Sequence, residues 1–82
     1  MSLSVQWGVY TRGTRNVTIT LPIATSVTYA VIAVARTENN YYCSGSQNCQ
    51  YISNVTNKTF QAGSYDAGNG YAGFWWIAIS KA

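Results

Sequence analysis

The sequence has 82 residues, the size of one small domain, and residues 1–82 are taken as a single unit. Only 9% of the residues are charged, against about 25% in an average soluble domain, and the net charge of +3 comes from scattered side chains. Scattered cations argue against a nucleic-acid-binding protein, which needs clustered Lys and Arg. The lack of any run of about 18 apolar residues excludes insertion into a membrane.

Six β-strands are expected in chain order. They cover about residues 5–10, 15–21, 29–35, 51–55, 59–62 and 73–80, where β-branched and aromatic residues dominate, and turn-forming residues lie between them. In the first strand Val5, Trp7 and Val9 alternate with smaller or polar residues, and Pro22 ends the second because proline has no N–H to donate. No stretch has helical periodicity. The expected fold is therefore all-β, a small antiparallel β-sandwich.

Two strands, 29–35 and 73–80, are apolar on both faces. A strand of this kind is buried on both faces, so one face should fill the core and the other should meet a second copy of the chain. Alternation along the last strand separates Phe74 and Trp76 from Trp75, Ile77 and Ile79, but it does not tell which set is the core. The residues expected to form the core or the subunit interface are Trp7, Phe74, Trp75, Trp76, Ile77 and Ile79.

The chain is poor in groups that perform catalysis. It has no His and only two acidic residues, Glu38 and Asp66, which both fall in expected loops. Cys43 and Cys49 have no His partner for a zinc site or an activated thiol, so they are either a disulfide that closes a short loop or two free thiols. We expect no enzymatic activity, no metal and no cofactor.

Tyrosine is the most informative residue type for function. A tyrosine side chain combines a large apolar ring with a hydroxyl at low entropic cost, which suits binding loops, although loop tyrosines can also close the base of a loop or line a subunit interface. If every strand reverses direction, the connections at 11–14, 36–50 and 63–72 share the end far from the N-terminus. The candidate ligand-binding residues in these connections are Arg12, Asn39, Asn40, Tyr41, Tyr42, Tyr65, Asp66, Asn69 and Tyr71.

Several segments occur in a characteristic order: Gln6-Trp7-Gly8, the strands at 17–22 and 29–35, the segment 52–60, and the terminal Gly73-Phe74-Trp75-Trp76-Ile77-Ala78-Ile79. This order resembles the C-terminal domain of bacteriophage tail fibres, the knob at the fibre tip, which often ends in an aromatic-Trp-Ile-Ala-Ile-Gly segment. The chain departs from that pattern at Ser80-Lys81-Ala82 and in its longer 36–50 loop.

The resemblance implies a homotrimer at the tip of a fibre that attaches a virion, or a phage-derived tail-like particle, to its host. The architecture is also similar to that of small trimeric β-sandwich lectins. Such a tip would be made in the host cytoplasm, act outside the cell, and bind a bacterial surface glycan or an outer-membrane protein through its distal loops. Two alternatives stay open: a trimerisation and folding cap without receptor contact, and a free-standing lectin.

Overall fold

The computed structural model describes residues 3–37, 50–65, 67 and 70–81, and every regular element in these ranges is a β-strand. The strands are β1 (Leu3–Tyr10), β2 (Val17–Thr20), β3 (Val27–Thr37), β4 (Tyr51–Ser53), β5 (Thr59–Gly63) and β6 (Tyr71–Lys81). The described residues contain no helix long and apolar enough to cross a membrane. The all-β prediction is therefore confirmed, and each expected strand overlaps an observed one, although β2 and β4 are shorter than expected.

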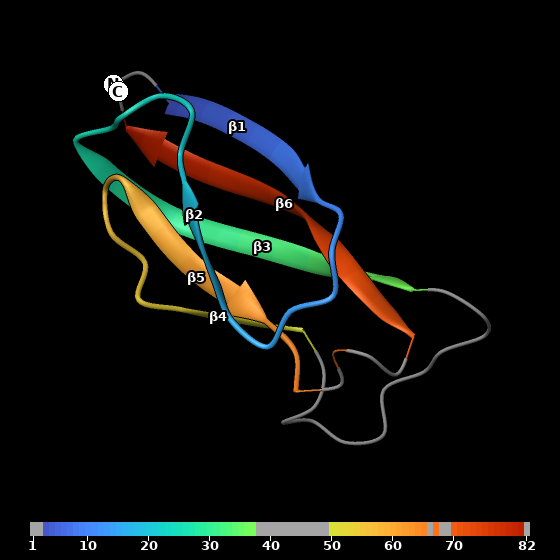
Figure 1. Cartoon of the computed structure of the whole chain (residues 1–82). Coiled ribbons are helices and arrows are strands. Elements are labelled where there is room, and N and C mark those ends of the chain that lie inside the picture. The colour runs from blue at the N-terminus through green and yellow to red at the C-terminus, as the bar shows by residue number, and fades with distance from the viewer. Residues whose placement is uncertain (1–2, 38–49, 66, 68–69, 82) are drawn as a thin grey trace.

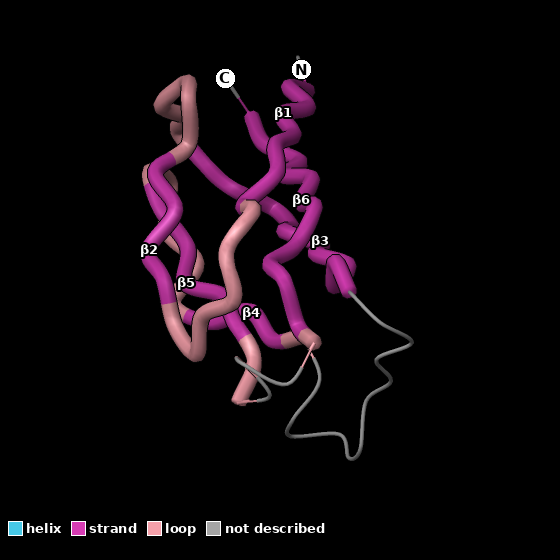
Figure 2. The backbone as a smooth tube through the Cα atoms, turned by 45° about the vertical axis from the view of Figure 1, so that its right-hand side comes forward, coloured by secondary structure: helices cyan, strands magenta, loops and turns pink. Residues whose placement is uncertain are grey.

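The six strands form two three-stranded antiparallel sheets that pack face to face (Figures 1 and 2). The first, called here the long sheet, has the order β1-β6-β3, and the second, called the short sheet, has the order β2-β5-β4. All pairings within the two sheets are antiparallel. The molecule is thus the small antiparallel β-sandwich that the strand pattern predicts.

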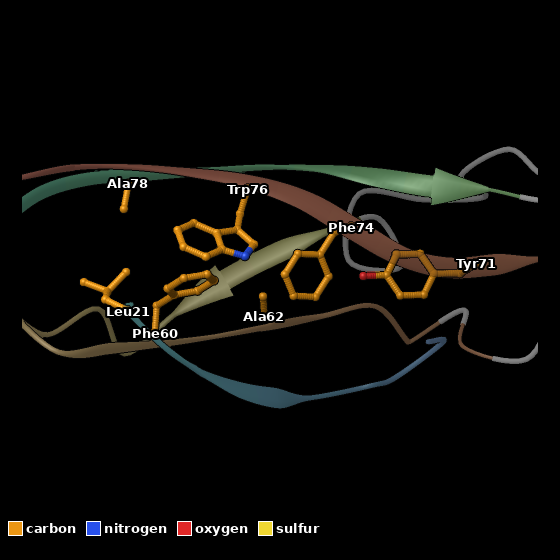
Figure 3. Packing of buried hydrophobic residues seen from close by; sticks show 7 residues of the cluster. All are labelled: Leu21, Phe60, Ala62, Tyr71, Phe74, Trp76 and Ala78. Atoms are coloured by element: carbon orange, nitrogen blue, oxygen red, sulfur yellow. The ribbon is translucent and has the colours of Figure 1, made fainter. Parts of the chain in front are cut away.

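The core lies between the sheets and is built on aromatic contacts (Figure 3). The rings of Phe60 and Trp76 meet edge to face with centroids 5.3 Å apart, and Tyr10 stacks on Phe74 at 5.6 Å. Aromatic side chains contribute large apolar areas, so this small domain can fill its interior with few residues. The buried apolar residues are Leu21, Phe60, Ala62, Tyr71, Phe74, Trp76 and Ala78.

Strand β6 is central in the long sheet, and the structure shows which of its two sets of side chains faces the core. Phe74, Trp76 and Ala78 face the core, whereas Trp75 and Ile77 are exposed on the outer face of the sheet. The alternation of side chains along a strand separates these two sets. The described residues form two sheets, and the short sheet covers only the inner face of β6.

Strand β6 is longer than predicted at its N-terminal end, since it begins at Tyr71 rather than Gly73. Gly73 has a φ of +107°, and a Cβ at this position would lie 1.9 Å from the carbonyl oxygen of Tyr10. Only glycine accommodates both the conformation and the close approach. The pairing of β6 with β1 ends at Phe74, whereas the pairing with β3 continues to Tyr71. Gly73 therefore marks the point where β6 extends past β1.

Both ends of the sandwich are defined by the strand register. Leu3 pairs with Lys81, so the start of β1 and the end of β6 lie side by side (Figure 1). The connections 21–26 and 54–58 lie at this same end, where the backbone N–H of Ser26 donates to the carbonyl of Lys81 and that of Thr25 donates to the carbonyl of Asn57. We call this end the proximal end and the opposite one the distal end.

Candidate functional site

The distal end brings together segments that are far apart in the sequence. The backbone N–H of Ser64 donates to the carbonyl of Thr14 at 3.0 Å, which joins the connection after β5 to the connection after β1. The hydroxyl of Tyr51, at the start of β4, donates to the carbonyl of Arg15. These contacts fix a surface at the end of the short sheet, in agreement with the expectation that alternate connections share one end.

Tyr51 lies across the short sheet rather than along it. It pairs directly with Gly63 of β5, and paired residues project from the same face of a sheet. The backbone carbonyl of Arg15, which accepts the hydrogen bond from the Tyr51 hydroxyl, lies on the other side of β5. It is so close to β5 that a Cβ on Gly63 would come within 2.3 Å of its oxygen. The ring therefore crosses β5 at the residue that has no side chain.

Tyr65 stacks on Tyr51. The two ring centroids are 6.0 Å apart with an angle of 25° between the planes. Partial burial raises the pKa of the Tyr51 hydroxyl, and the neighbouring Tyr65 raises it further. Tyr65 is 57% exposed, so the pair presents aromatic surface to solvent. We call Tyr51 and Tyr65 the distal tyrosine pair.

Polar side chains continue from the distal tyrosine pair along the outer face of the short sheet. Arg15 and Asn16 are exposed next to the Tyr51 hydroxyl. Farther along the sheet, Asn54 Nδ2 donates to Gln61 Oε1, and Gln61 Nε2 donates to the hydroxyl of Thr18. The surface therefore combines two aromatic rings with amides, hydroxyls and one guanidinium.

Tyr71, a predicted ligand-binding residue, is placed in the core. It is 3% exposed, and its hydroxyl donates to Gln50 Oε1. Burial is the largest cause that raises its pKa, to about 12; the hydrogen bond to Gln50 acts in the opposite direction, and Tyr51 adds to the increase. Tyr71 thus supports the base of the distal end rather than lying on its surface.

The remaining predicted ligand-binding residues divide into two groups. Arg12 is exposed directly after β1, and Tyr65 is exposed after β5. Six candidates, together with the two cysteines, lie outside the described residues: Asn39, Asn40, Tyr41, Tyr42, Asp66, Asn69, Cys43 and Cys49. Sequence reasoning did not identify Tyr51 or Arg15, because Tyr51 falls at a strand start and only the pairing with Gly63 brings it to Arg15.

A second surface is formed by the outer face of the long sheet. Register places Val5 opposite Ile79, Trp7 opposite Ile77, and Val9 opposite Trp75, while Ile32 and Val34 continue the same face on β3. Among the described residues, Trp7 is the most exposed large apolar residue, at 73%. The large apolar side chains exposed on this face, called here the apolar face, include Leu3, Val5, Trp7, Val9, Val27, Ile32, Val34, Trp75 and Ile77.

Arg36 closes the distal edge of the apolar face. Its guanidinium lies 5.5 Å from the ring centroid of Trp75, a cation–π geometry, and its Nη1 donates to the carbonyl of Ala72 at 2.7 Å. The charge therefore stays paired with a ring and a carbonyl while the adjoining side chains remain apolar. The described residues contain no group of three or more His, Cys, Asp or Glu that could hold a metal ion.

Comparison with known proteins gives one family. A family model described as "Putative tail fiber protein gp53-like, C-terminal" matches residues 3–80. No curated protein and no solved structure gives a significant match to the chain. The matched range includes β1 to β5, β6 as far as Ser80, the distal tyrosine pair and the apolar face.

Proposed function

The chain belongs to the family of gp53-like tail fibre C-terminal domains, and from this premise we propose that it is the non-catalytic receptor-binding tip of a bacteriophage or phage-derived tail fibre. Its receptor is a glycan or an outer-membrane protein on the bacterial surface. The observation that carries this proposal is the separation of the two ends. The start of β1 and the end of β6 pair at the proximal end, whereas the connections that follow β1 and β5 meet at the distal end beside Tyr51 and Tyr65.

The fibre shaft would join the domain at its proximal end, next to Leu3. The distal surface would then face away from the particle and meet the host first. Tyr65, exposed there in the turn after β5, is the type of residue that binding loops favour because it offers contact area at low entropic cost. The tip acts in the virion, outside the cell in which it is made.

We further propose that three copies of the chain associate through the apolar face. Monomeric soluble proteins rarely expose a large continuous apolar patch, and such patches mark interaction sites. The outer face of the short sheet is different, because Thr18, Thr20 and Gln61 occupy it. One face is thus suited to another copy and the other to solvent.

The receptor role is tested with the intact fibre. Exchange of the distal connections between two fibres with different hosts should move host range with the loops, while each fibre still assembles. Purified domain should also bind susceptible cells and compete with particles for adsorption. The proposal fails if the trimeric domain binds no susceptible strain and loop exchange leaves host range unchanged.

A second candidate function is a trimerisation and folding cap, which the apolar face favours. Deletion of the domain from the fibre separates the two functions. Loss of trimeric fibres would support the cap, whereas assembled fibres that no longer adsorb would support the receptor role.

A further inference from the structure

We propose that the distal tyrosine pair is a stacking platform for a pyranose ring of a host surface glycan. The inference rests on the receptor-binding role proposed above and names the ligand class and the residues that contact it. Tyr51 and Tyr65 contribute the platform, and Arg15 and Asn16 contribute hydrogen bonds at its edge.

The exposed ring surface suits a ligand that has one apolar face. Tyr65 stacks on Tyr51 with an angle of 25° between the planes and is 57% exposed, so apolar ring surface is available to a ligand. A pyranose has a face of C–H groups that can pack on an aromatic ring, while its hydroxyls point outward around the edge. The exposed ring would therefore be covered on binding without burying a sugar hydroxyl against carbon.

The polar groups fit the ligand's edge. Arg15 and Asn16 are both exposed, and the backbone carbonyl of Arg15 accepts the hydrogen bond of the Tyr51 hydroxyl, so both side chains branch from backbone next to the ring pair. A guanidinium only donates, whereas an amide both donates and accepts. Sugar hydroxyls require both kinds of partner. Aromatic surface bordered by a few polar groups is the usual composition of a small-molecule site, in which polar groups fix the ligand's orientation.

The Tyr51 ring, on which Tyr65 stacks, is held in place before a ligand arrives. The Tyr51 hydroxyl is bonded to the Arg15 carbonyl, and the ring crosses β5 at Gly63. Its rotation is therefore restricted at both ends of the side chain. A contact surface that is already ordered loses less conformational entropy on binding, which improves affinity without additional contacts. Gly63 is required for this arrangement, because a Cβ there would lie 2.3 Å from the Arg15 carbonyl oxygen.

The test uses the full chain and polysaccharide purified from the surface of a susceptible host strain. Tyr65→Ala removes the outer ring and should weaken binding to the polysaccharide about tenfold or more, which is a loss of about 1.4 kcal/mol. Tyr65→Phe keeps the ring and removes only the hydroxyl, so its binding should stay within about threefold of the parent. Val55→Ala, which shortens an exposed apolar side chain in the 54–58 connection at the proximal end, is the control and should bind like the parent.

Each variant is first checked for the circular dichroism spectrum and the mass of the parent, so that a folding defect is not read as a binding defect. Parent-like binding by Tyr65→Ala overturns the platform and leaves the receptor role intact. A parent chain that binds susceptible cells but not their polysaccharide also overturns the platform, because the receptor is then not this glycan. Binding to neither cells nor polysaccharide overturns both proposals.

Discussion

Trp75 and Trp76 are neighbours in the chain but lie on opposite faces of the long sheet. Trp76 is buried against Phe60, with ring centroids 5.3 Å apart, whereas Trp75 is 53% exposed beneath the guanidinium of Arg36. The same residue type thus fills the protomer core at position 76 and belongs to the apolar face at position 75. The two tryptophans form a matched pair for separating folding from association.

The first prediction follows from this pair. Trp76→Ala should lower the free energy of unfolding by about 3–5 kcal/mol, because it leaves a cavity beside Phe60. Trp75→Ala should preserve the β-sheet circular dichroism spectrum but weaken association of the copies. Urea denaturation at one fixed chain concentration and native mass spectrometry measure the two effects. A trimeric Trp76→Ala protein with the parent's melting temperature would contradict the core assignment.

The second prediction concerns the apolar face as a subunit interface. The parent should have a mass of about 27 kDa in light scattering, three times the 9.0 kDa of one chain. Ile32→Asp would bury an unpaired charge in that interface, so this variant should run as a monomer. Thr20→Asp, on the outer face of the short sheet, is the control and should stay trimeric. A monomeric parent would refute the proposed trimer.

The third prediction concerns Gln6, a buried polar residue on β1. Its amide Nε2 donates to the carbonyl of Ile23 at 2.8 Å, and its Oε1 accepts from the backbone N–H of Ile23 at 2.9 Å. Gln6→Ala leaves both backbone groups without these partners and should cost about 1–3 kcal/mol of stability. Gln61→Ala, which removes an amide from the outer face of the short sheet, should cost less. Thermal denaturation of the two variants compares them, and equal melting temperatures would argue against a structural role for the Gln6 amide.

The fourth prediction is a loss of stability at alkaline pH. Burial raises the pKa of Tyr71 from 10.0 to about 12, so the folded chain holds this proton more tightly than the unfolded chain does. The stability that the folded chain gains from this proton is complete below about pH 10 and is lost as pH rises from about 10 to about 12. Tyr71→Phe should flatten the fall of melting temperature across this range and remove a step near pH 12 from the tyrosinate absorbance titration. A variant with the parent's alkaline profile would contradict this assignment.

The fold could be predicted from the sequence because its evidence is local. The alternation of side chains along a strand is visible in the sequence at Val5, Trp7 and Val9. The same alternation placed Trp75 and Trp76 on opposite faces of their strand, although it did not tell which face is the core. Strand ends were harder to predict. The start of β6 at Tyr71 depends on the positive φ of Gly73 and on pairing with Thr37, which lies far away in the chain.

The candidate site could be predicted only in part, because it depends on contacts between distant segments. Tyr65 was identified from its loop and its residue type. Tyr51 was not, since its position over β5 requires the pairing with Gly63 and the hydrogen bond to Arg15, 36 residues earlier. Tyr71 shows the opposite case: its residue type suits a binding loop, but the extension of β6 carries its ring into the core.

The pairing of Leu3 with Lys81 has a practical consequence for labelling the molecule. A fluorescent protein joined through a flexible linker after Lys81 would sit beside the start of β1, at the end of the sandwich opposite Tyr65. A reporter there would leave the distal tyrosine pair uncovered. The domain could therefore be developed as a bacterial stain or a capture reagent, with its cargo attached to one end while the other end selects the strain.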